Sequence, residues 1–107
     1  MHLFNSSGQW IAVKLGKYLY DSSSNWIGWF PWDDENAADK NGKYLGTIYP
    51  GQRFYKLDYF PYRGYPGYPG YPGYPGYQGY PGYQGYSPRP TGTSDYTEQQ
   101  LKAIGKS

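Results

Sequence analysis

The acidic residues and the single histidine are the side chains with which this chain could do chemistry. Asp21 and Asp39 could form the carboxylate pair of a small glycoside-type hydrolase. Each of them also begins a short polar segment, where an Asp side chain commonly bonds the backbone two residues on. His2 stands alone near the first residue, which is a poor position for a general base. We therefore predict that the protein is not an enzyme, and a small hydrolase is the remote alternative.

An acidic run at Asp33–Asn36 offers the oxygen ligands that a hard cation prefers. The run lacks the spacing of a calcium-binding loop, and a solvated loop explains it as well. The chain contains no Cys, which excludes disulfides, zinc ribbons and thiol chemistry. We predict neither a metal nor a cofactor.

Four aromatic residues form the densest aromatic group of the chain: Trp26, Trp29, Phe30 and Trp32. On a strand, Trp26 and Phe30 would point to one face and Trp29 to the other. One face would be core, and the other could be an exposed patch that contacts a protein partner or a membrane interface. The alternative is that all four pack inside a small domain that is short of aliphatic residues.

Three segments that align without gaps must position these side chains: residues 5–13, 21–29 and 39–47. Each segment runs through Asn or Asp, two polar residues, Gly or Ser, another polar residue, an aromatic residue, Ile or Leu, and then Gly or Ala. An Asn or Asp at the head of a turn, with Gly inside it, predicts a tight β-hairpin. In the second copy Ser24 and Asn25 replace the glycine, and we expect Asn25 to tolerate the turn conformation.

The residue after the Ile or Leu is always small: Ala12, Gly28 or Gly46. Within a strand, such a residue indicates a close backbone approach or a sharp bend. The three copies together indicate strands that crowd around a common axis. A fourth unit is degraded, with a turn at Pro50-Gly51 and a strand at 53–57, and its hairpin could be complete or incomplete.

These repeats resemble the four-fold β-flower domain family. The matching residues are Leu19-Tyr20-Asp21 with Trp26-Ile27-Gly28, and the run from Asp39 to Gly46. The resemblance covers about residues 2–58 and implies four hairpins arranged like petals in a shallow, pseudo-four-fold barrel. The family has no established activity, and its likeness to the Tubby C-terminal fold implies membrane or lipid contact.

The third repeat also resembles one unit of WG-type β-repeats, which are usually longer and more numerous. Either resemblance leads to the same fold class. We predict an all-β domain of three to four repeated hairpins over residues 1–60, followed by two further segments.

The second segment, residues 61–90, is a low-complexity Tyr-Pro-Gly repeat. Its backbone could be disordered, a polyproline II helix, a series of type II turns or, less consistently, one strand of a collagen-like helix. The segment could be a flexible spacer. It could instead be an associative tail, because regularly spaced tyrosines suit weak multivalent contact with a protein partner or a second copy. The candidate contacts are Tyr65, Tyr68, Tyr71, Tyr74, Tyr77, Tyr80, Tyr83 and Tyr86.

The third segment, residues 91–107, is polar and contains a candidate short helix at 96–104. Asp95 fits the N-cap position, Leu101 and Ile104 share a face, and Gly105 would end the helix. A helix of this length is marginal alone, so a frayed terminus is the alternative.

The charge balance argues against nucleic acid as a partner, because the net charge is only +2 and no basic stripe is present. Residues 1–20 lack the basic start and apolar run of a signal peptide. No stretch approaches the roughly 20 apolar residues that span a bilayer. We therefore expect a cytoplasmic protein that could bind peripherally at a membrane. Its function is predicted to be a non-enzymatic binding or scaffold module, with peripheral membrane or lipid binding as the alternative.

Overall fold

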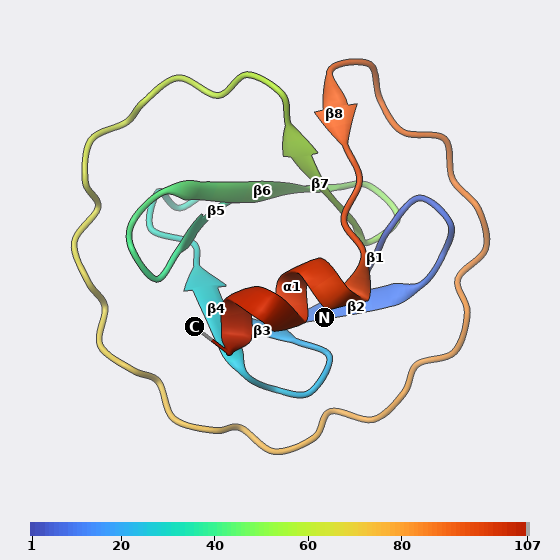
Figure 1. Cartoon of the computed structure of the whole chain (residues 1–107), viewed down its shortest axis with the longest axis horizontal. Helices are drawn as coiled ribbons and strands as arrows, with labels where there is room; N and C mark the ends of the chain where they lie inside the picture. Colours follow the sequence, from blue (N-terminus) through green and yellow to red (C-terminus); the bar gives the residue numbers. More distant parts are fainter. Residues whose placement is uncertain (107) are drawn as a thin grey trace.

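A computed structural model describes residues 1–106 of the chain, and Ser107 lies outside the described residues. The fold is a closed, seven-stranded β-barrel with one additional strand and one short helix near the C-terminus (Figure 1). This confirms the all-β prediction. The elements are β1 (His2–Phe4), β2 (Trp10–Leu15), β3 (Tyr18–Asp21), β4 (Trp26–Trp29), β5 (Asn36–Asp39), β6 (Tyr44–Tyr49), β7 (Arg53–Leu57), β8 (Thr93–Ser94) and α1 (Glu98–Gly105).

Each strand from β1 to β7 pairs antiparallel with the next along the chain. The barrel closes where β1 and β7 pair in parallel, with Phe4 opposite Arg53. The backbone N–H of Phe4 also donates to the carbonyl of Gln52 at 2.9 Å. Closure leaves no open sheet edge between the first and last barrel strands.

The three predicted hairpins are β1–β2, β3–β4 and β5–β6, and they have the same register. In each, the small residue faces the middle of the preceding strand, as Leu3–Ala12, Leu19–Gly28 and Ala37–Gly46. The next pair in every hairpin follows a β-bulge and places the aromatic residue of the repeat opposite the residue before the turn. A bulge bends its strand and increases the local twist, which a small closed barrel requires.

The turns of these hairpins use the side-chain chemistry expected from the sequence. The Oδ1 atom of the first turn residue accepts the backbone N–H four positions on, at 3.0 Å for Asn5, 2.9 Å for Asp21 and 3.0 Å for Asp39. Gly8 and Gly42 have φ values of 90° and 86°. In the second turn the residue with positive φ is Ser24, at 65°, rather than the Asn25 that we expected.

The small residues lie at close approaches, as the repeat predicted. A Cβ atom on Gly28 would lie 2.2 Å from the carbonyl oxygen of Ala38 on the neighbouring strand. A Cβ atom on Gly46 would lie 2.5 Å from the ring of Phe54. Neither position can accept a side chain without displacement of its neighbour.

The helix α1 lies across the barrel and contacts β2, β3 and β4 (Figure 1). Leu101 on its inner face is fully buried in the main core, and Ile104 packs against the same cluster. A capping box starts the helix: the Thr97 hydroxyl accepts the Gln100 N–H at 3.1 Å, and the Gln100 side chain accepts the Thr97 N–H at 2.8 Å. The N-cap is therefore Thr97, and the prediction of Asp95 was wrong.

Candidate functional site

The fourth hairpin is complete, and the Tyr-Pro-Gly repeat is inserted in its turn. The return strand is β8, where Leu57 faces Thr93. The Asp58 N–H donates to the Gly92 carbonyl at 2.8 Å, as the first residue of every other turn donates to the residue four positions on. Residues 59–91 therefore replace the short turn of the other three hairpins. The repeat is a loop anchored at both ends and not the tail that the sequence suggested.

Residues 61–90, which we call the belt, run around the outside of the barrel (Figure 1). No helix, strand or turn is formed from Tyr59 to Pro90. The glycines of the repeat, from Gly64 to Gly85, have φ values between 80° and 90°. A polyproline II chain has φ near −75° throughout, so the belt departs from this one of the conformations considered from the sequence. Its glycines instead have the φ of the third residue of a type II turn, which was another of them.

Trp10, the aromatic residue of the first hairpin, holds one part of the belt. Its ring lies 6.0 Å from the ring of Tyr77 and 6.0 Å from that of Tyr80, both in angled geometry. His2 lies against the same indole at 5.3 Å, and its Nε2 atom is 3.1 Å from the carbonyl oxygen of Gly79. Edge-to-face and tilted ring pairs of this kind are each worth about 0.5–1.5 kcal/mol.

Trp26, the equivalent residue of the second hairpin, holds the belt in the same way. Its ring lies 5.7 Å from Tyr68 and 5.9 Å from Tyr71. Between them, the two tryptophans thus contact two pairs of belt tyrosines, and only Tyr74 separates those pairs along the sequence. The three-residue period of the belt therefore matches the spacing of the hairpins around the barrel.

Backbone hydrogen bonds tie the belt to the first turn. The Gln84 N–H donates to the Gly8 carbonyl at 3.0 Å, and the Ser87 N–H donates to the Ser6 carbonyl at 2.7 Å. A Cβ atom on Gly8 would lie 2.5 Å from the Gly85 backbone. Gly8 thus provides the positive φ that the turn needs and, because it lacks a side chain, allows the belt backbone to approach closely.

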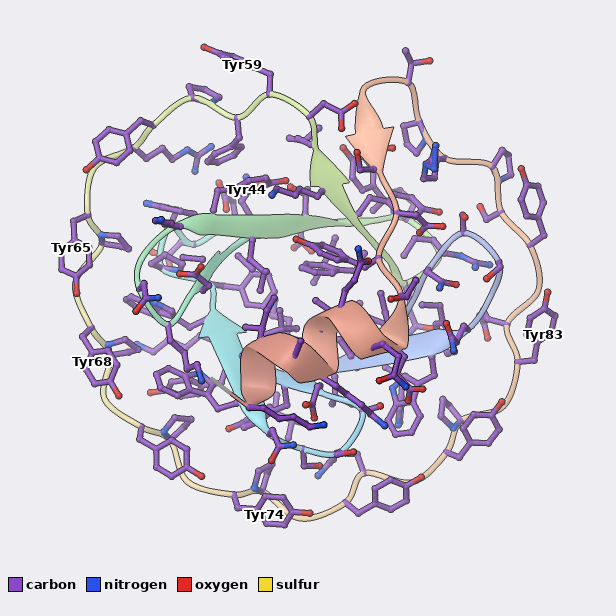
Figure 2. The ribbon with its side chains drawn as sticks, viewed as in Figure 1. Tyr44, Tyr59, Tyr65, Tyr68, Tyr74 and Tyr83 are labelled. Carbon is purple, nitrogen blue, oxygen red and sulfur yellow. The ribbon has the colours of Figure 1, made fainter. Side chains whose placement is uncertain are left out.

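The belt tyrosines present much of their surface to solvent. Figure 2 shows Tyr65, Tyr68, Tyr74 and Tyr83 at the outer edge of the molecule. From Tyr65 to Tyr86, every tyrosine of the repeat is between 58% and 73% exposed. The eight candidate contacts named from the sequence therefore form a ring of accessible phenol groups on a chain that the barrel holds in place.

The start of the belt forms an aromatic pocket of about 420 Å³ over the third hairpin. Phe60 stacks on Tyr44 with ring centroids 3.9 Å apart and planes 8° apart. Trp32 lies 5.9 Å from Phe60. The Arg63 guanidinium lies over both Trp32 and Phe60, at 5.2 Å and 4.8 Å, and forms an ion pair with Asp34 at 2.7 Å.

Two groups at this pocket, the Tyr44 hydroxyl and the Asp34 carboxyl, have shifted pKa values. Burial raises the pKa of the Tyr44 hydroxyl, and its hydrogen bonds to Thr47 and to the Leu57 N–H offset only part of that rise. Burial also acts to raise the pKa of Asp34. The hydrogen bonds from Arg63 and from the Asn36 N–H lower this pKa by more than burial raises it, so the net shift is downward. The pocket thus pairs an apolar wall with a fixed ion pair at its rim.

For the aromatic group of Trp26, Trp29, Phe30 and Trp32, the structure contradicts the exposed patch and agrees, at three of the four residues, with the alternative of packing inside the domain. Trp26, Trp29 and Phe30 are buried, with exposures of 5%, 8% and 4%. They therefore do not form an exposed surface for a partner or a membrane. Trp32 alone is partly exposed, and it lines the pocket over the third hairpin.

The acidic residues considered for catalysis or cation binding take part in turn hydrogen bonds or an ion pair. The Oδ1 atoms of Asp21 and Asp39 each accept two backbone N–H groups of their own turns. Asp34 pairs with Arg63. Among residues 1–106, no group of three or more His, Cys, Asp or Glu side chains could hold a metal ion. His2 is ordered in β1 against Trp10, not at a free terminus.

Sequence reasoning missed the pocket because its walls come from distant segments: Trp32, Tyr44 and the start of the belt. The turn-heading Asp58 was the available signal for the insertion. Asp58 matches the first residue of the other turns, whereas Gly92-Thr93 takes the place of pairs such as Gln9-Trp10 only in its hydrogen bond and strand pairing, not in residue type.

No family model, curated protein or solved structure matches the chain. Within the described part of the chain, no helix has the length and apolar character needed to cross a membrane.

Proposed function

We propose that this protein is a non-enzymatic binding or scaffold module whose tyrosine belt supports weak multivalent association, with other copies or with protein partners. The observation that carries the proposal is the exposure of the belt tyrosines, 58–73% from Tyr65 to Tyr86. Side chains of this kind are apolar enough to stack and polar enough to donate a hydrogen bond, and they lose little rotamer entropy.

The attachment of the belt to the barrel supports multivalency. A free Tyr-Pro-Gly chain must lose conformational entropy each time it binds. A belt that Trp10 and Trp26 hold against the barrel has already lost much of that freedom, so successive contacts cost less. Several weak contacts on one rigid ring then act together.

The similarity to the four-fold β-flower family belongs to the same proposal. Its support is the shared register of three hairpins and the fourth hairpin closed by β8. Such a barrel would carry its functional residues on the turns and on the surface between hairpins, which is where the belt lies.

The test compares two variants of the full chain by sedimentation velocity over a range of concentrations. One replaces Tyr74, Tyr83 and Tyr86 by Ser, because these rings have no ring contact within residues 1–106. The control replaces three exposed prolines of the belt by Ser: Pro75, Pro81 and Pro88.

We expect the wild type and the proline control to associate, and the tyrosine variant to associate at least about tenfold more weakly. Deletion of the belt is a poorer test, because it would uncover Trp10 and Trp26 and create a new apolar surface. A tyrosine variant that associates like the wild type would contradict the proposal.

A further inference from the structure

The aromatic residue of the third hairpin has fewer ring contacts with the inserted loop than its two equivalents. Trp10 and Trp26 each contact two belt tyrosines. Tyr44 occupies the same repeat position, yet the only ring of residues 59–91 that stacks on it, among the residues described, is Phe60. The 420 Å³ pocket lies beside that stacked pair.

The sequence of the insertion explains the difference. The strict Tyr-x-Gly period runs through the contacts with Trp10 and Trp26 and begins only at Tyr62, because the preceding triplet reads Tyr59-Phe60-Pro61. Tyr59 and Tyr62 are 80% and 87% exposed, the highest values among the large hydrophobic residues, and Tyr62 lies at the edge of the pocket. The insertion therefore stacks one ring, Phe60, on Tyr44, and it places the ring of Tyr65 against Gly42 of the third turn. Both rings line the pocket, whose remaining space no residue of the insertion fills.

We propose that this pocket receives a tyrosine of a Tyr-Pro-Gly segment from a second copy of the chain. The two equivalent positions of the same barrel, Trp10 and Trp26, already hold tyrosines of that repeat. The inference rests on the proposed function and names the surface through which copies associate.

The pocket has the chemistry to hold a phenol. Aromatic side chains provide most of its lining: Trp32, Tyr44, Phe60, Tyr62 and Tyr65. The Arg63 guanidinium lies over Trp32 and Phe60, and Arg63, Asn41 and Lys43 provide donors. A phenol oxygen can accept such donors while its ring is stacked. The outward tyrosines of a second belt are exposed enough to reach a pocket of this kind.

The experiment uses full-length variants that block or open the pocket. Asn41→Trp adds a large ring at an exposed position of the third turn, and Trp32→Ala removes a wall. Ser7→Trp is the matched control, since Ser7 is the exposed residue at the equivalent position of the first turn. Sedimentation velocity measures association, and circular dichroism confirms that each variant is folded.

We expect Asn41→Trp and Trp32→Ala to weaken self-association about tenfold, with Ser7→Trp close to the wild type. The peptide Gly-Tyr-Pro-Gly-Tyr-Pro-Gly, with both ends blocked, should shift the NMR signal of the Trp32 indole N–H in the wild type. It should not shift this signal in the folded Asn41→Trp variant.

Equal association of all variants would overturn the pocket assignment and leave the proposed function in place. Weaker association without any effect of the peptide on Trp32 would also overturn it, because the pocket would then bind something other than this repeat. A wild type that does not associate at any concentration would overturn the pocket assignment together with self-association.

Discussion

In the barrel, strands β1 to β7 pair with neighbours on both sides, and their interior residues form one buried cluster with Leu101 of α1. The belt has no secondary structure, and its tyrosines are mostly exposed. Its order comes from a few ring contacts with Trp10 and Trp26 and from hydrogen bonds to the first two turns. Two parts of one small chain thus reach a defined position by different means.

Because the barrel and the belt are held by different contacts, the stability of one should be separable from that of the other. Loops held by few buried contacts open at lower free energy than the core does. A loop as long as residues 59–91 without secondary structure is also uncommon in a compact domain and is often functional. Changes to the barrel should therefore unfold the protein, and changes to the belt should mainly affect association.

The largest expected effect is at Leu101, where the helix enters the core with 0% exposure. Leu101→Ala should lower the free energy of unfolding by about 2–5 kcal/mol, because it leaves a cavity. The control on the same helix is Gln99→Ala, at an exposed position, which should change stability by less than about 0.5 kcal/mol. Urea unfolding followed by circular dichroism measures both, and equal effects would show that α1 does not pack into the barrel.

Two glycine substitutions compare the regions directly. Gly28→Ala should cost about 1–3 kcal/mol, because its Cβ would collide with the Ala38 carbonyl. Gly73→Ala meets open space and should cost only about 1 kcal/mol, from its φ of +89°. If Gly73→Ala proves the more costly in thermal unfolding, the belt must be packed more tightly than the contacts described here.

Alkaline pH should weaken the barrel. Burial raises the pKa of the Tyr20, Tyr44, Tyr55 and Tyr96 hydroxyls above the ordinary value of 10.0. Each raised pKa contributes stability that is fully present below pH 10 and is lost as pH rises through the folded-state pKa. Tyr96→Phe should therefore reduce the loss of unfolding free energy between pH 9 and 11. An unchanged pH dependence would mean that this phenol is not buried.

The smallest effect is expected at the ion pair between Arg63 and Asp34, which lies at the partly exposed start of the belt. The lowered pKa of Asp34 contributes stability that is present above about pH 3.9 and lost as pH falls through the folded-state value. Asp34→Asn should cost less than about 1 kcal/mol at pH 7 and should reduce the dependence of stability on pH below 4. Asp33→Asn, at an exposed neighbour, is the control. The two variants should differ in acid unfolding curves, and identical curves would argue against the pair.

Much of the barrel could be predicted from the sequence, because the residues that define each hairpin turn lie within that turn. Asn5, Asp21 and Asp39 head turns whose hydrogen bonds are local, and the small residues report close approaches. The all-β class and the three hairpins followed from these residues. The burial of Trp26 and Trp29 was one of two alternatives, because the alternation of side chains along a strand allows one face to be exposed.

The belt and the pocket depend on contacts between residues far apart in the sequence. Composition alone made residues 61–90 look like a free tail, since nothing within the repeat buries apolar surface. What orders the repeat lies elsewhere, in Trp10, Trp26 and the return strand at Thr93. Local patterns do not reveal that a loop begins and ends in one hairpin.

Nuclear Overhauser spectroscopy of the full chain can show whether the barrel holds the tyrosine repeat at Trp10 and Trp26. We expect cross-peaks from the Trp26 indole to the rings of Tyr68 and Tyr71, and from the Trp10 indole to those of Tyr77 and Tyr80. Belt tyrosines with random-coil shifts and no cross-peak to either indole would contradict this expectation.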